Sequence, residues 1–132
     1  MRDKIVTKEE MMRLPYIIAV DFDGTIVEDA YPKIGELKDF VLQEIKDLQK
    51  VGVKIILWTS RDGKELNDAV EFCADNGMIF DAVNENLKEC QEMFHNDTRK
   101  VYANEYWDDK AVGAYCNNYL GKYFSNLANN VS

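Results

Sequence analysis

Two aspartates, Asp21 and Asp23, lie directly after an apolar run in the stretch AVDFDGTIVED at 19–29. Residues two apart on a strand point to the same side, so we expect both carboxylates to face one site. A carboxylate at the end of a buried strand is unfavourable unless a charged partner meets it there. The pair therefore indicates a binding or catalytic site with a cationic partner.

Polar residues that could complete such a site occur at two other apolar runs: Thr59, Ser60 and Arg61 at the end of 53–59, and Asp108 with Asp109 after 100–107. Three or more carboxylates brought together cannot all stay ionised without a counter-charge. A hard divalent cation supplies it, and Mg²⁺ keeps several waters that a substrate phosphate can replace. The residue types predict a magnesium site where hydroxyl and basic groups hold phosphate oxygens and a carboxylate can attack phosphorus.

The apolar pattern alternates between strand-like and helix-like segments. It predicts strands at 16–22, 53–59, 78–83 and 100–107, with helices at 34–52, 62–77 and 86–95 and a last apolar helical face from residue 112. This alternation implies right-handed crossovers and a mostly parallel sheet that is covered on both faces. The predicted fold class is α/β, a three-layer α/β/α Rossmann-like domain. Ligands bind such sheets at the carboxyl ends of the strands, where the polar residues lie.

Helix-capping spacing occurs at two places outside the candidate site. Thr7 with Glu10 predicts a short helix within the N-terminal residues, and Asp62 with Glu65 predicts a capping box before the helix at 62–77.

Length and composition restrict the class of protein. The 132 residues suit a single domain, 1–132, with 1–14 as an N-terminal extension. A net charge of -8 argues against non-specific binding to nucleic acid or to anionic membranes. The N-terminus lacks the apolar core of a signal peptide, no run reaches a membrane span, and three cysteines without a CxxC pair are typical of free thiols. We expect a cytoplasmic protein.

The stretches AVDFDGTIV, ILWTSR and YWDDKAVG, in this order, resemble the motifs of the haloacid dehalogenase (HAD) superfamily of phosphohydrolases. The resemblance covers a core at 16–125. It implies a magnesium-dependent phosphatase that hydrolyses a small phosphate monoester through an aspartyl-phosphate intermediate. About ten residues separate Thr25 from the first long helix and about forty separate Thr59 from Lys100, so neither gap has room for a sizeable cap domain. The chain is therefore similar to the small, capless members.

The resemblance implies roles for the residues of the first two motifs. Asp21 corresponds to the nucleophile, which also ligates the metal. Asp23 corresponds to the general acid/base, and its backbone carbonyl contacts the metal. Gly24 and Thr25 belong to the same motif and are expected beside the substrate, and Thr59 corresponds to the hydroxyl that binds the transferring phosphoryl group.

Further basic and polar groups are expected at the site. The resemblance implies a lysine before the last motif, for which Lys100 is the best match and Lys88 the alternative. Ser60, next to the hydroxyl motif, is expected to hold phosphate oxygens. Arg61 is expected to help hold the substrate.

The acidic pair Asp108 and Asp109 corresponds to the residues that complete the metal site, and either one could be the direct ligand. By itself such a pair would more often begin a helix, because acidic residues suit helix N-termini. Its combination with Asp21 favours the metal site. The alternative function is a non-catalytic binding or regulatory module that keeps the HAD-like scaffold.

The expected partner is a small phosphorylated metabolite, whose identity the sequence does not specify. Residues 26–34 are expected to form a flap beside the pocket. Tyr115, Tyr119 and Tyr123 on the last helix leave room for a contact between subunits of a homo-oligomer.

Overall fold

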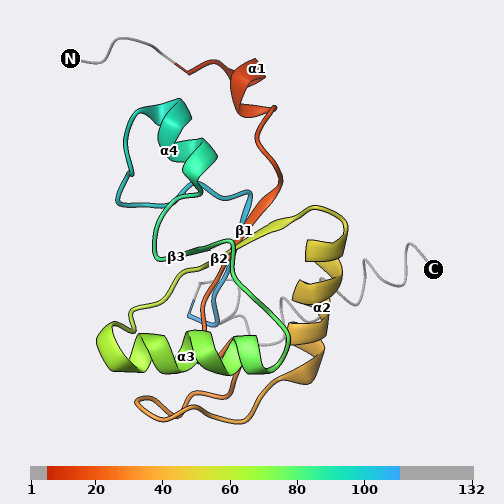
Figure 1. Cartoon of the computed structure of the whole chain (residues 1–132), viewed down its shortest axis with the longest axis vertical. Coiled ribbons are helices and arrows are strands. Elements are labelled where there is room, and N and C mark those ends of the chain that lie inside the picture. Colours follow the sequence, from red (N-terminus) through yellow and green to blue (C-terminus); the bar gives the residue numbers. More distant parts are fainter. Residues whose placement is uncertain (1–5, 111–132) are drawn as a thin grey trace.

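Four parallel strands form a sheet at the centre of residues 6–110, the part of the chain that the computed structural model describes (Figure 1). The elements in chain order are α1 (Lys8–Met11), β1 (Ile17–Val20), α2 (Asp39–Lys50), β2 (Lys54–Leu57), α3 (Gly63–Asp75), β3 (Ala82–Val83), α4 (Lys88–Phe94) and β4 (Glu105–Trp107). The strand order is β3-β2-β1-β4, and every pairing is parallel. β1 is therefore central, between β2 and β4, so their carboxyl ends meet at one edge.

Both faces of the sheet are apolar and covered, as expected for parallel strands. Ile18 and Val20 of β1 pack into one cluster with buried residues of α2 and α3. Ile17 and Ala19 face the other way and pack with Cys90 of α4. Figure 1 shows α4 on one side of the strands and α2 with α3 on the other. The predicted three-layer, Rossmann-like α/β architecture is confirmed.

The last two strands are shorter than the sequence predicts, because side chains take over pairing that backbone groups would otherwise make. At the start of β3, the Asp81 carboxylate accepts the Ile55 N–H at 2.8 Å. Before β4, the Asn104 side chain accepts the Ile17 N–H at 2.8 Å. The apolar residues between 100 and 104 therefore approach the sheet as a loop.

The two capping predictions have different outcomes. Thr7 is the N-cap of α1, and its hydroxyl accepts the Glu10 N–H at 3.1 Å, which confirms the first. Asp62 is the N-cap of α3 in an extended conformation, but its side chain makes no capping hydrogen bond. The predicted capping box before α3 is therefore wrong.

The connections between the elements are short enough to exclude a cap domain within the described residues. The β1–α2 connection is a single flap, and 58–104 are occupied by α3, β3, α4 and their loops. No helix between residues 6 and 110 is long and apolar enough to cross a membrane. The last predicted helix, with its three tyrosines, lies outside the described residues.

Candidate active site

A pocket of about 770 Å³ opens at the carboxyl ends of the strands. Its walls are formed by Asp21, Asp23, Asp29, Tyr31, Trp58, Thr59, Ser60, Asn84, Asp108 and Lys110. Five of these residues are ones that the sequence places in the site. The flap contributes Asp29 and Tyr31, in agreement with its expected position beside the pocket.

Three carboxylates converge beside this pocket from the ends of β1 and β4. Asp21, Asp108 and Asp109 each offer an oxygen, and these oxygens lie within 4.8 Å of one another. Burial raises the pKa of Asp21 to about 6, with further contributions from the two partners and from Asp23. The Phe22 N–H, which donates to Asp21 at 2.8 Å, opposes this shift. Burial likewise raises the pKa of Asp109.

The donor set of this triad fits a hard divalent cation. All three ligands are carboxylate oxygens, the type that Mg²⁺ prefers. Asp109 Oδ1 is also buried and has no hydrogen-bond partner among the described residues. A buried, unpartnered carboxylate oxygen is costly, and a cation between the three side chains would remove that cost.

Gly24 allows Asp109 to approach β1. A Cβ at this position would lie 2.0 Å from Asp109 Oδ2, and the backbone φ is +84°, which L side chains rarely adopt. The Lys38 ammonium donates to the Gly24 carbonyl at 3.0 Å and supports the turn. Gly24 therefore has a structural role in the turn; neither Gly24 nor Thr25 lines the pocket, and their expected place beside the substrate stays a prediction.

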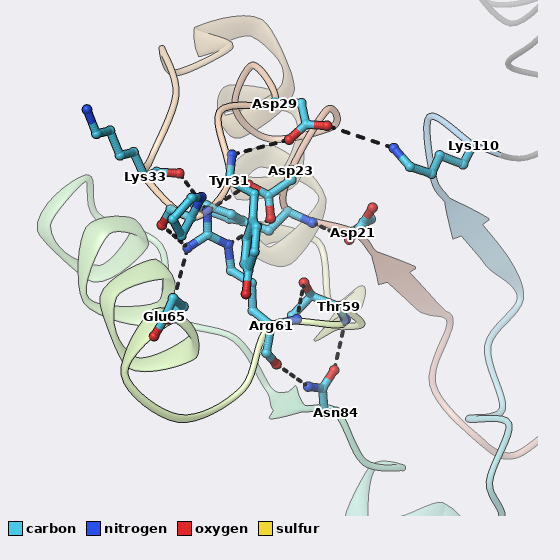
Figure 2. A network of polar contacts seen from close by, with 12 residues as sticks. Asp21, Asp23, Asp29, Tyr31, Lys33, Thr59, Arg61, Glu65, Asn84 and Lys110 are labelled. Atoms are coloured by element: carbon cyan, nitrogen blue, oxygen red, sulfur yellow. Dashed lines mark hydrogen bonds and ion pairs between the residues drawn. The ribbon is translucent and has the colours of Figure 1, made fainter.

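Asp23 is held by Arg61 in a two-pronged ion pair (Figure 2). Arg61 Nε donates to Asp23 Oδ2 and Nη2 donates to Asp23 Oδ1, each at 2.7 Å. Arg61 is only 1% exposed and does not line the pocket. The expectation that Arg61 holds the substrate is therefore wrong, because its guanidinium is occupied by groups of the protein itself.

Thr59 is positioned by Asn84, a site residue that the sequence analysis missed. The Thr59 N–H donates to Asn84 Oδ1 at 2.8 Å, and Thr59 Oγ1 accepts the Arg61 N–H at 3.2 Å. Asn84 follows β3 with a φ of +54°, in the left-handed region that asparagine tolerates better than most residues. The sequence signal that could have identified Asn84 as a site residue is its position directly after the third strand.

The basic group in the pocket is not the one that the resemblance suggested. Lys100 precedes β4 by five residues, toward the amino end of the strand, and its ammonium lies 5.0 Å from the Tyr106 ring centre at a second, smaller cavity. Lys88 begins α4 and does not line the pocket either. Lys110 does, and its Nζ lies 3.9 Å from an Asp29 carboxylate oxygen (Figure 2). The same atom also lies 3.9 Å from an Asp109 carboxylate oxygen. The sequence signal that could have identified Lys110 is its position directly after the acidic pair Asp108 and Asp109.

A solved structure of a conserved protein from Bacteroides thetaiotaomicron is similar to this chain. The two are 38% identical, the match covers 81% of this chain and 90% of that one, and the TM-score is 0.66. The chain belongs to the same protein family as this Bacteroides protein. No protein-family model and no curated protein matches the sequence. The family relationship supports the α/β fold.

The arrangement combines three kinds of group around one space. A carboxylate cluster that fits a cation lies on one side, the hydroxyls of Thr59 and Ser60 lie on another, and the Lys110 ammonium stands at the rim. Phosphate esters need such a combination, because charge on the transferring group has to be neutralised from several directions.

Proposed function

We propose that the protein is a magnesium-dependent phosphatase that hydrolyses a small phosphate monoester through an aspartyl-phosphate intermediate. The observation that carries the proposal is the convergence of Asp21, Asp108 and Asp109 within 4.8 Å, with a buried and unpartnered oxygen on Asp109. The resemblance to HAD phosphohydrolases supports the same assignment for Asp21 and Asp23.

In the first step, an Asp21 oxygen attacks phosphorus as the bond to the leaving oxygen breaks, and Asp23 gives that oxygen its proton. In the second step, Asp23 takes a proton from water, the water oxygen attacks phosphorus, and inorganic phosphate leaves with Asp21 restored. Thr59, Ser60 and Lys110 hold the phosphoryl oxygens throughout. Mg²⁺, held by Asp21 and the acidic pair 108–109, would supply the positive charge that brings phosphate and carboxylate together.

Asp23 is placed to do this although Arg61 engages both of its oxygens. Each carboxylate oxygen has a second acceptor site, and the Asp23 side chain is 16% exposed toward the pocket that it lines. The ion pair therefore fixes the orientation of Asp23 and leaves one edge of the carboxylate for the substrate.

The test is magnesium-dependent release of nitrophenol from nitrophenyl phosphate, followed by a panel of phosphorylated metabolites. We expect turnover that a chelator abolishes, and a loss of roughly a thousandfold or more in Asp21→Asn. Lys64→Gln is the matched control, because this lysine is 83% exposed and, among residues 6–110, pairs with Asp68 on its own helix. Full turnover in folded Asp21→Asn contradicts the proposal. Magnesium binding without turnover of any phosphate would instead favour the non-catalytic module.

A further inference from the structure

The buried guanidinium of Arg61 is fully satisfied by hydrogen bonds. Arg61 is one of two buried polar residues within the described part of the chain. All five of its N–H donors have acceptors: besides Asp23, Nη2 donates to the Lys33 carbonyl at 2.7 Å, and Nη1 donates to those of Pro32 and Glu65 at 3.3 and 3.2 Å. A buried charge is tolerated only with such complete pairing.

These acceptors belong to three separate parts of the fold (Figure 2). Asp23 lies just after β1, Pro32 and Lys33 lie on the flap, and Glu65 lies in the first turn of α3. One side chain therefore joins the end of the central strand, the flap and a helix.

Within the described residues, the outer part of the flap makes few other contacts with the rest of the fold, and its backbone hydrogen bonds stay within the β1–α2 connection, as from the Glu28 N–H to the Glu36 carbonyl. All the residues at 28–33 are exposed, so the segment contributes no buried side chain to the core. The Tyr31 ring centre lies 5.1 Å from the Arg61 guanidinium, and Tyr31 lines the pocket. The ion pair of Asp29 with Lys110 is long, at 3.9 Å, and both side chains are more than half exposed, so it adds little.

We infer that Arg61 is a positioning residue, a buried latch that holds the flap and its Tyr31 as a fixed wall of the pocket and orients Asp23 toward the substrate. The role of Arg61 in holding the flap follows from these contacts alone, whereas its role in orienting Asp23 for catalysis rests on the proposed function. A lysine could not replace Arg61, because one ammonium cannot reach acceptors on both the carboxylate and the flap in a planar fork.

Trypsin tests the flap without any need for turnover. Lys33 is exposed, but its carbonyl, which belongs to the bond that trypsin would cut, is bound to Arg61. We expect cleavage after Lys33 to be at least about tenfold faster in Arg61→Gln and Arg61→Lys than in the wild type, because opening the flap no longer breaks charged hydrogen bonds. Lys64→Gln should be cut at the wild-type rate. Wild-type resistance at Lys33 in a folded Arg61 variant overturns the latch.

A second variant keeps the test decisive if the Arg61 variants do not fold. Asp23→Asn keeps the shape of the carboxylate but removes its charge and one acceptor, while every backbone contact of Arg61 remains. We expect it to fold and to be cut after Lys33 several-fold faster than the wild type. An unchanged rate at this site would show that Asp23 and the flap are not joined through Arg61.

Two phosphate esters test the role in catalysis. A poor leaving group needs the proton of Asp23 in the transition state, whereas a good one does not. Arg61→Lys should therefore lower kcat for an alkyl phosphate about tenfold more than for nitrophenyl phosphate. Equal losses on both esters overturn the effect on Asp23. If the wild-type protein hydrolyses neither ester, the proposed function is contradicted. The trypsin experiment then still tests whether Arg61 holds the flap.

Discussion

Asp21 is the residue at which the fold opposes ionisation most clearly. Burial and the three neighbouring carboxylates raise its pKa to about 6, against 3.8 for an unperturbed aspartate. Between these two values the folded protein holds a proton that the unfolded chain releases. The free energy of unfolding therefore falls as the pH rises from about 4 to about 6, and the full penalty is present above that range.

Asp21→Asn should remove this penalty in the metal-free protein. We expect the variant to be more stable than the wild type at pH 7, by up to about 2 kcal/mol once the partial exposure of the site is considered. It should also lose most of the change in Tm between pH 4 and pH 7. Thermal unfolding in the presence of a chelator measures both effects. Asp29→Asn, which alters an exposed pocket carboxylate outside the triad, is the control, and a wild-type pH profile in Asp21→Asn would contradict the explanation.

At the scale of the elements, the shape of the turn after β1 decides whether Asp109, which follows β4, can approach the end of β1. Gly24→Ala would meet a left-handed φ and an Asp109 oxygen 2.0 Å from the new Cβ. Gly52 also has a positive φ, +96°, but a Cβ there would have no neighbour within 4 Å. We expect Gly52→Ala to cost about 1–2 kcal/mol and Gly24→Ala roughly 3 kcal/mol or more, in urea unfolding. Equal losses would mean that the backbone angle alone matters.

The same two strand ends would be joined by a bound cation. Mg²⁺ binds the folded triad and not the unfolded chain, so it should raise Tm by roughly 5 °C or more at about a hundredfold excess over Kd. The double variant Asp108→Asn with Asp109→Asn should lose that shift, because it removes two of the three ligands. Asp29→Asn should keep it. A shift that persists in the double variant would place the metal elsewhere in the chain.

Topology explains which site residues the sequence could predict. Asp21 and Thr59 follow the two longest apolar runs, and a parallel sheet necessarily brings the ends of neighbouring strands together. The resemblance, and not the topology, points to Lys100: this lysine lies at the amino end of the predicted strand 100–107 and five residues before β4, so a parallel sheet does not bring it to the edge where the site forms. The burial of Arg61 is not predictable from the sequence, because it depends on carbonyl groups of a flap whose path no local pattern encodes. The sequence therefore favours a contact between Arg61 and the substrate instead.

At the scale of the whole molecule, the sheet separates two apolar layers that differ in size within residues 6–110. The layer formed by α2 and α3 contains helices of 12 and 13 residues. The other layer contains α4, with 7 residues, and a smaller cluster of buried side chains. A layer with less buried apolar surface opens at a lower free energy, so the α4 side should unfold first.

One buried cysteine in each layer reports on this difference. Cys73 of α3 is 1% exposed and Cys90 of α4 is fully buried, and burial raises the pKa of both thiols, that of Cys73 to about 12. Neither thiol should react with a maleimide until its layer opens, because both the access and the thiolate are missing in the closed state. At low denaturant, we expect Cys90 to be alkylated several-fold faster than Cys73, as measured for each peptide by mass spectrometry. Equal rates would mean that both layers open only in global unfolding, and faster labelling of Cys73 would reverse the proposed order.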